Sequence, residues 1–343
     1  MSPVAPDPAV VAGDVARALA EDVGSGDVTA ALLPDTTDDA YLLCKEPAVV
    51  CGRPWFDACV RALDPDARID WRVAEGDHVT AGTVLATLRG RARALVTAER
   101  TALNFMQTLS ATATTTAAHV AAVAGTGTRI LDTRKTIPGL RHAQKYAVRT
   151  GGGTNHRMGL HDTVMLKENH VRAAGSIARA VAAARASQPA LPLIVEVETI
   201  AQLEEALAAG CERILVDDFA PAMRREAVRI ARGAPWNGRI PLEVSGGVGL
   251  EGLRAFAEEG VLVEDLGSTN GSFVNGQRVQ RAVARPGDEI GFDRMRFRLV
   301  APGRPAAAPA ATPARDAAVP SPWWWVAIAA AAIASVWALA LLR

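Results

Sequence analysis

Between residues 129 and 260, short apolar runs alternate with stretches of helical pattern, and this alternation limits the fold more than any other feature of the chain. Apolar runs that alternate with helices of about ten residues predict βα units around a parallel sheet, either closed or open. The predicted strands cover 129–132, 163–166, 193–197, 213–216 and 240–244, and the predicted helices cover about 174–186, 200–209, 221–232 and 250–259.

Polar residues stand at the end of each of these five predicted strands. In parallel α/β folds the ligand lies at the carboxyl ends of the strands, so these residues are candidates for a site. In chain order they are Thr133, Arg134 and Lys135, then Lys167, then Glu196, then Asp217, and finally Ser245, Gly246 and Gly247.

The charges of the chain are unevenly placed. The whole sequence has 37 basic and 37 acidic residues, which argues against nucleic-acid binding through bulk charge. Residues 129–170, however, hold eight Lys or Arg against three Asp or Glu, together with four of the six histidines. A local positive excess beside the strand ends favours a small anionic ligand, such as a phosphate or a dicarboxylate.

Lysine is rare in this chain and is concentrated near the predicted site. Only four of the 37 basic residues are Lys, and three of them, Lys135, Lys145 and Lys167, lie within 33 residues of one another. Where Arg is the usual cation, a Lys indicates a position that needs a compact ammonium group, although chance clustering remains an alternative.

Two carboxylates, Glu196 and Asp217, end neighbouring predicted strands. Beside a basic pocket they suit Mg²⁺ with a phosphorylated substrate, or the hydroxyls of a ribose. Ion pairing with the basic cluster is the alternative interpretation. The backbone N–H groups of Ser245, Gly246 and Gly247, which precede a helix, are suited to binding a phosphate.

The N-terminal part has a different pattern. Helical spacing over 10–20, strand-and-turn patterns over 41–51 and 68–90, and a long helix over 97–122 with Thr97 as a possible cap predict a separate α/β unit. No signal peptide is expected, and four cysteines without a CxxC spacing are typical of a reducing compartment. We therefore expect a cytoplasmic catalytic part.

After residue 260 the pattern changes twice. Residues 263–300 read as short strands, and residues 301–322, with six Pro and nine Ala, read as a linker. Residues 323–342 are 20 residues without a charge, which predicts a C-terminal transmembrane helix that anchors the protein; a buried helix of a globular domain is the alternative.

Several segments resemble the quinolinate phosphoribosyltransferase family over about residues 10–260. They are 21–29 (EDVGSGDVT), 99–104 (ERTALN), 132–141 (DTRKTIPGLR), 145–148 (KYAV), 151–157 (GGGTNHR) and 166–170 (LKENH). The resemblance implies an N-terminal α/β sandwich over 1–110 and an incomplete six-stranded α/β barrel over 111–260. It also implies an enzyme that makes nicotinate mononucleotide, CO₂ and pyrophosphate from quinolinate and phosphoribosyl pyrophosphate with Mg²⁺, in NAD biosynthesis.

The resemblance also implies residue roles. Arg134, Lys135, His156, Arg157 and Lys167 would bind quinolinate, Glu196 and Asp217 would serve the ribose and Mg²⁺, and Ser245, Gly246 and Gly247 would bind phosphate. Thr133 would contact substrate, and Arg100 would reach into the site of a partner subunit in a homodimer. We expect Lys135, Lys167, Glu196 and Asp217 to be the catalytic groups.

The resemblance ends near residue 260. Residues 261–300 instead resemble the C-terminal half of a forkhead-associated (FHA) domain, with Thr269 and Asn270 in its peptide-contacting loop and its phosphate-binding half missing. The sequence therefore predicts a barrel without its last strand, with impaired activity. A gene fusion, a deletion or a sequence error explains this, and a genuine architecture in which the β segment covers the barrel edge is the rival. A non-catalytic fusion product or a membrane-anchored phosphopeptide-binding protein is the alternative function.

Overall fold

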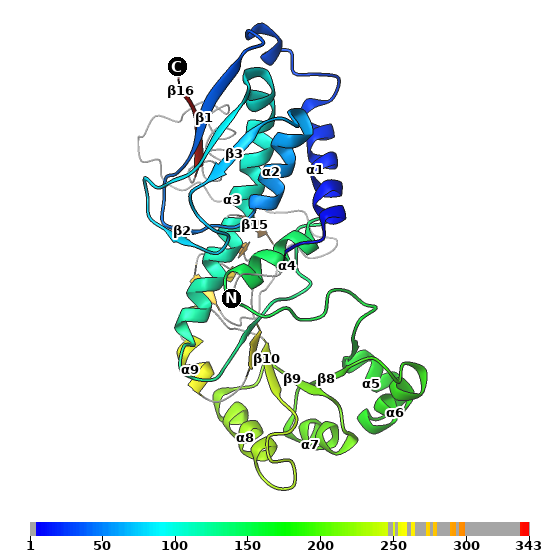
Figure 1. Cartoon of the computed structure of the whole chain (residues 1–343). Helices are drawn as coiled ribbons and strands as arrows, with labels where there is room; N and C mark the ends of the chain where they lie inside the picture. Colours follow the sequence, from blue (N-terminus) through cyan, green and yellow to red (C-terminus); the bar gives the residue numbers. More distant parts are fainter. Residues whose placement is uncertain are drawn as a thin grey trace.

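The protein was analysed as a computed structural model, which describes residues 5–245, 250, 253–258, 262–264, 272–274, 277–279, 289–292, 295–298 and 337–342. Figure 1 shows an upper part made from the N-terminal sequence and a lower α/β part, with the long helix α3 (Ala92–Ala122) running from one into the other.

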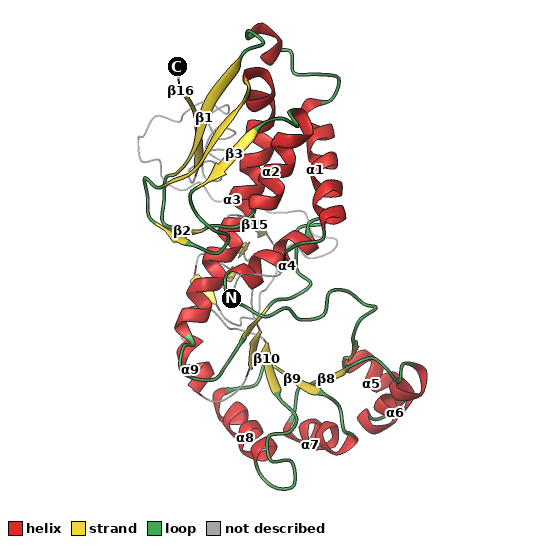
Figure 2. Ribbon diagram, viewed as in Figure 1, coloured by secondary structure: helices red, strands yellow, loops and turns green. Residues whose placement is uncertain are grey.

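The N-terminal unit is a sheet covered by helices. Its strands follow the order β16-β1-β5-β3, all antiparallel, and a two-stranded sheet joins β2 and β4. Figure 2 shows α1, α2 and α3 together beside the sheet. The elements are α1 (Pro8–Val23), the 3-10 turn η1 (Ala30–Leu32), β1 (Thr37–Cys44), β2 (Ala48–Val49), α2 (Arg53–Leu63), β3 (Arg68–Trp71), β4 (His78–Val79) and β5 (Val84–Arg91).

Local sequence explains two of these helices. The Asp7 side chain accepts a hydrogen bond from the Ala9 N–H at 2.9 Å, and Pro8 follows it, which together start α1. Helix α2 was not predicted from the sequence. It starts after Gly52, whose φ of +114° favours glycine, and it buries Trp55 and Phe56 on one face.

Helix α3 begins earlier than predicted. It extends over 31 residues from Ala92, so Thr97 lies inside it, and the predicted cap at Thr97 is wrong. The Thr97 hydroxyl donates to the Arg93 carbonyl at 2.8 Å and to an Asp27 carboxylate oxygen at 3.0 Å. The side chain therefore ties the helix to the segment before β1.

The lower part contains the predicted βα units. Its six parallel strands follow the order β6-β11-β10-β9-β8-β7. The strands are β6 (Ile130–Leu131), β7 (Val164–Leu166), β8 (Leu193–Val197), β9 (Arg213–Asp217), β10 (Leu242–Ser245) and β11 (Leu262–Glu264). The helices are α4 (Arg141–Thr150), α5 (Glu168–Ala174), α6 (Ile177–Ser187), α7 (Ile200–Ala209), α8 (Pro221–Arg232) and α9 (Leu253–Glu258). The five strands and four helices predicted between 129 and 260 are all found, with small shifts of their ends.

The predicted absence of a last barrel strand is wrong. Strand β11 lies between β10 and β6 and pairs with both in parallel, with Val263 opposite Val244 and Ile130. A parallel strand between two others needs only a short extended segment whose backbone groups pair on both sides, and Leu262–Glu264 supplies it. The structure thus favours the architecture in which the chain after residue 260 completes the sheet.

The β segment that follows forms its own sheet. Strands β12 (Ser272–Val274), β13 (Gln277–Val279), β14 (Glu289–Phe292) and β15 (Met295–Arg298) are antiparallel, in the order β13-β12-β14-β15. The predicted strands over 272–274 and 295–299 match β12 and β15. Thr269 and Asn270 lie outside the described residues.

The predicted C-terminal transmembrane helix is not found. Residues 337–342 form β16 (Trp337–Leu342), which pairs with β1 in antiparallel fashion through six residue pairs. An apolar run with β-branched and aromatic residues nearby can pair with an open sheet edge as readily as it can form a helix. Residues 323–336 and the linker 301–322 lie outside the described residues. None of the helices in the described part of the chain has both the length and the apolar character needed to cross a membrane.

Candidate active site

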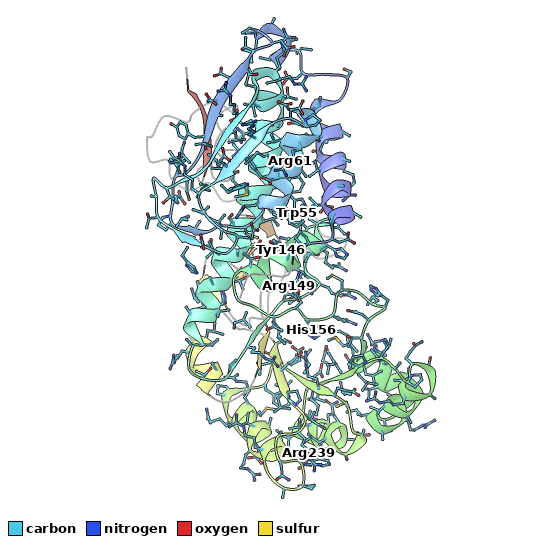
Figure 3. All side chains as sticks on the ribbon, viewed as in Figure 1. Trp55, Arg61, Tyr146, Arg149, His156 and Arg239 are labelled. Carbon is cyan, nitrogen blue, oxygen red and sulfur yellow. The ribbon has the colours of Figure 1, made fainter. Side chains whose placement is uncertain are left out.

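The strand ends of the barrel carry polar side chains on its inner face. In β8, β9 and β10 the apolar residues Val195, Val216 and Val244 pack into the cluster formed with the outer helices. Because side chains alternate along a strand, Glu196, Asp217 and Ser245 face the opposite side, inside the barrel. Figure 3 shows His156 at the end of the barrel that faces the N-terminal unit, and Arg239, which precedes β10, at the other end.

The structure joins Lys167 and Glu196 in an ion pair, which is the alternative interpretation that the sequence left open for the strand-end carboxylates. Lys167 follows β7 and caps α5, and its Nζ lies 2.5 Å from Glu196 Oε2. The Lys167 side chain is 49% exposed and the Glu196 side chain is 12% exposed. The pair therefore lies at the open end of the barrel, where a substrate carboxylate or phosphate can reach the ammonium group.

Asp217 and Ser245 form a second polar pair on neighbouring strands. The Ser245 hydroxyl donates to Asp217 Oδ1 at 2.5 Å, and the two residues are register partners between β9 and β10. Both are half-buried. Gly246 and Gly247, the rest of the predicted phosphate loop, lie outside the described residues.

A second polar group joins three buried residues, Lys145, Asp132 and His156, with the half-buried Asn155. Lys145 of α4 is 1% exposed and forms an ion pair with Asp132, which follows β6. Asp132 also accepts hydrogen bonds from the His156 N–H at 2.8 Å and from the Asn155 side-chain amide at 2.5 Å. Burial raises the pKa of the Asp132 carboxyl, while Lys145 and the two N–H groups oppose that shift. Asp132 thereby joins β6, α4 and the 154–157 segment.

The 133–136 segment carries three of the predicted substrate residues, Thr133, Arg134 and Lys135. Lys135 is exposed, and its backbone N–H donates to the Thr133 hydroxyl at 2.9 Å. Arg141 donates to the carbonyls of Arg134 and Met158, each at 3.3 Å. This guanidinium therefore links the loop after β6 to the loop before β7, a role that the sequence did not predict.

Arg100 is separate from the strand-end groups of its own chain. It is exposed on α3, between Thr97 and Thr101, whose hydroxyls contact Asp27 and Asp22 of the N-terminal unit. Its predicted insertion into a partner's site stays a prediction.

Comparisons with known proteins decide the family. Models of the N-terminal and C-terminal domains of quinolinate phosphoribosyl transferase match residues 27–110 and 112–272. The chain is 44% identical over 246 residues to a protein of Synechocystis named probable nicotinate-nucleotide pyrophosphorylase (carboxylating), covering 71% of this chain and 82% of that relative. It is 43% identical over 260 residues to the nicotinate-nucleotide pyrophosphorylase (carboxylating) of Mycobacterium leprae, covering 72% and 88%. The chain belongs to the quinolinate phosphoribosyltransferase family.

The fold agrees with this family. The solved nicotinate-nucleotide pyrophosphorylase of Francisella tularensis superposes with a TM-score of 0.73 at 40% identity, covering 76% of this chain and 91% of that one. The prediction of an enzyme of this pentosyltransferase family is confirmed, as is the α/β fold.

An FHA domain model matches residues 252–293, which overlaps the end of the phosphoribosyltransferase match. Strand β11 falls in the overlap and pairs as a barrel strand, whereas β12 and β13 belong to the separate antiparallel sheet. One continuous segment therefore supplies both the last barrel strand and the start of the FHA-like sheet.

The donor set of this phosphoribosyltransferase suits Mg²⁺. Glu196 and Asp217 end neighbouring strands, and Mg²⁺ in proteins is usually held by one or two carboxylates together with substrate phosphate oxygens. Within the described residues no group of three or more His, Cys, Asp or Glu could hold a metal by itself.

The sequence prediction also missed the polar barrel residues Asn155, Arg213 and Glu243. Glu243 is completely buried in β10 and forms an ion pair with Arg213 of β9. A Glu between Leu242 and Val244, in the middle of an apolar strand, is the signal that could have revealed it.

Proposed function

We propose that this chain is a carboxylating nicotinate-nucleotide pyrophosphorylase, which joins quinolinate to phosphoribosyl pyrophosphate in NAD biosynthesis. The observation that carries the proposal is the pairing of Lys167 with Glu196 and of Ser245 with Asp217 at adjacent strand ends, beside the basic 134–157 region. The names of the relatives, quoted above, support the same substrates.

The charges of the site fit both substrates. Arg134, Lys135, Arg157 and Lys167 provide cations for the two carboxylates of quinolinate. When pyrophosphate leaves the ribose, positive charge develops on the anomeric carbon, and the carboxylates of Glu196 and Asp217 can stabilise it. The donors for the ribose phosphate would be Ser245 with Gly246 and Gly247.

The bond changes then follow from the chemistry of the pyridine ring. The ring nitrogen attacks the anomeric carbon as the bond to pyrophosphate breaks, and the nitrogen becomes cationic. When the carboxylate on the neighbouring ring carbon leaves as CO₂, the electron pair of the broken bond stays on that carbon, where the adjacent cationic nitrogen stabilises it. A proton then binds this electron pair and takes the place of the carboxylate. The protein orients two anions and excludes water, so no covalent nucleophile is needed.

We further propose that Glu196 and Asp217 hold Mg²⁺, which supplies positive charge to the departing pyrophosphate. A test is to remove divalent ions with a chelator and to restore Mg²⁺ alone. We expect turnover to be lost and then recovered, and full turnover in the presence of chelator would contradict the proposal.

A homodimer is also part of the proposal. Val28 and Leu32 are each 83% exposed near the α3 surface that carries Arg100, and Leu160 and Ile137 are 76% and 46% exposed on the loops beside the site. Exposed apolar side chains in two separate places suit an interface in which each subunit covers the other's site. Sedimentation of wild type and Leu32→Asp tests this, since the variant should dissociate and lose activity together.

The activity itself is tested with the full chain. Purified protein is mixed with phosphoribosyl pyrophosphate and quinolinate labelled in the 2-carboxyl group, and labelled CO₂ and nicotinate mononucleotide are measured. We expect both products in equal amounts. A protein that is folded by circular dichroism and dimeric, but that releases no CO₂, would refute the function.

The FHA match motivates a second candidate function, phosphopeptide binding. The N-terminal half of such a domain, which supplies the phosphate-binding residues in that family, is missing from the sequence. We therefore expect no heat of binding when phosphothreonine peptides are titrated into the full chain.

A further inference from the structure

Glu243 is a completely buried carboxylate for which the proposed reaction gives no role. Its neighbours along β10, Leu242 and Val244, pack into the cluster with the outer helices, so its side chain faces the inside of the barrel. Ser245, two residues later, shares that face. The buried charge therefore lies directly under the open end of the site.

Two groups face the Glu243 carboxylate. Oε1 forms an ion pair with the Arg213 guanidinium of β9, and Oε2 lies 3.3 Å from His156 Nε2. Neither Glu243 Oε2 nor His156 Nε2 has a hydrogen-bond partner among the described atoms, and the His156 side chain is 3% exposed. Burying a charge is costly unless it is paired. The buried site therefore restricts which side chains can stand at positions 243 and 156.

The other ring nitrogen of His156 is also engaged by the protein. Nδ1 accepts a hydrogen bond from the Arg157 backbone N–H at 2.6 Å. Since Nδ1 is an acceptor, the ring hydrogen is assigned to Nε2, the nitrogen that lies 3.3 Å from Glu243 Oε2. The backbone N–H and carbonyl of His156 are held by Asp132 and Lys145, at 2.8 and 3.2 Å.

We infer that Glu243 is a positioning residue, which orients the His156 ring so that the ring fixes the backbone of Arg157 and thereby the guanidinium offered to quinolinate. Arg213 holds Glu243 from the other side. This inference rests on the proposed function for its substrate, but the geometry of the three residues does not depend on it. His156 acts in this arrangement through Arg157, because both of its ring nitrogens face protein groups.

The first experiment compares Glu243→Gln with wild type in the full chain. The amide keeps the size of the side chain but removes the charge that faces the His156 ring. We expect the KM for quinolinate to rise about tenfold, because a displacement of less than about 1 Å weakens an oriented contact strongly, while the KM for phosphoribosyl pyrophosphate changes less than about twofold.

A matched control is Glu212→Gln. Glu212 also forms an ion pair with an arginine, Arg185, but it lies at the amino end of β9, away from the strand ends that carry the site. Both KM values should stay at the wild-type level. Equal changes of both KM values in Glu243→Gln, or none, would overturn the inference.

A double-mutant cycle asks whether the effect passes through Arg157. In an Arg157→Ala background, Glu243→Gln should change the KM for quinolinate by less than about twofold, since the group it positions is gone. An undiminished tenfold effect in that background would show that Glu243 acts elsewhere. If Glu243→Gln does not fold, Arg213→Gln removes the outer partner instead and should raise the same KM about threefold.

Histidine ring NMR gives a readout without turnover. With ¹⁵N-labelled histidine, wild-type His156, assigned by loss of its signals in His156→Gln, should show its hydrogen on Nε2, and Glu243→Gln should shift its ring signals while leaving the other five histidines unchanged. A hydrogen on Nδ1 would overturn the inference. Failure of the proposed function is distinct, because it would appear as an inactive wild type.

Discussion

Lys145 and Lys167 each pair with a carboxylate in the same barrel, but the two pairs lie in opposite surroundings. The side chains of Lys145 and Asp132 are 1% and 4% exposed, whereas those of Lys167 and Glu196 are 49% and 12% exposed. The buried pair joins three segments of backbone. The open pair ends two strands and faces the side from which substrate enters.

The difference in exposure gives the two lysine–carboxylate ion pairs different roles, one in stability and one in substrate binding. A buried ion pair is expensive to break because the remaining charge has no partner, so it fixes the segments that carry Arg134 and Arg157. In the open pair the Lys167 side chain is 49% exposed, so its ammonium group is accessible to a substrate anion and its ion pair is weakened by solvent. We therefore expect substitutions in the buried pair to lower stability more than activity. Substitutions in the open pair should lower activity more than stability.

The largest effect is expected at the buried pair. Asp132→Asn leaves the Lys145 charge without a counterion and should lower the free energy of unfolding by about 3–5 kcal/mol, measured by urea denaturation. The double variant Asp132→Asn, Lys145→Met should be more stable than Asp132→Asn alone. A loss below about 1 kcal/mol in the single variant would remove the distinction between the two pairs.

The next effect concerns β11, the strand that joins β10 to β6 in the parallel sheet. Val263→Pro removes a backbone donor from β11, which is paired on both sides, and should cost on the order of 2–3 kcal/mol. Activity should fall with stability, because Ser245 lies on the neighbouring strand. Val263→Ile, which keeps the donor, is the control. Equal melting temperatures for the two variants would mean that β11 does not support the barrel.

Strand β11 also shows where sequence reasoning failed. The strands β6 to β10 could be predicted because each is a short apolar run followed by polar residues, a pattern that depends on nearby residues only. Residues 262–264 resemble another family in their local sequence, yet a parallel strand in a sheet gap needs only backbone pairing. The position of a segment in a sheet depends on its spatial neighbours, which a local motif does not encode.

The candidate site was predictable to a similar extent. Lys167, Glu196, Asp217 and Ser245 end strands, so the rule that ligands lie at the carboxyl ends was enough to bring them together. The contacts of Lys145, Arg213 and Glu243 depend on which interior side chains meet across the barrel. Sequence spacing contains no such information, although the rarity of Lys did direct attention to Lys145.

The open pair should respond through activity rather than stability. Lys167→Arg should lower kcat/KM by about tenfold or more, since a broad planar guanidinium cannot occupy the position of a compact ammonium between substrate carboxylates. Its melting temperature should stay near wild type, because exposed ion pairs contribute only about 0–1 kcal/mol. Lys45→Arg, the same change at an exposed lysine of the N-terminal unit, should alter neither. Near-normal turnover in Lys167→Arg would refute the argument.

The smallest effect extends the comparison to Glu75, a half-buried carboxylate that accepts hydrogen bonds from backbone N–H groups and pairs with no lysine. Glu75 accepts hydrogen bonds from the Gly52 N–H at 2.6 Å and the Arg53 N–H at 3.2 Å, and burial raises the pKa of its carboxyl above the ordinary 4.5. With a raised pKa, the folded protein binds this proton more readily than the unfolded chain does. Stability should therefore fall as pH rises from about 4.5 through the raised pKa, and level off above it.

Glu75→Gln should remove that part of the pH dependence. In this pH window the slope of the unfolding free energy against pH should change by no more than the amount that corresponds to one bound proton. The slope is measured by urea denaturation at closely spaced pH values. Glu46→Gln, at an exposed carboxylate, serves as the control and should leave the slope unchanged. If wild type and Glu75→Gln have parallel pH profiles, the hydrogen bonds from the protein stabilise the charged Glu75 carboxylate as fully as water does, and this half-buried carboxylate needs no lysine.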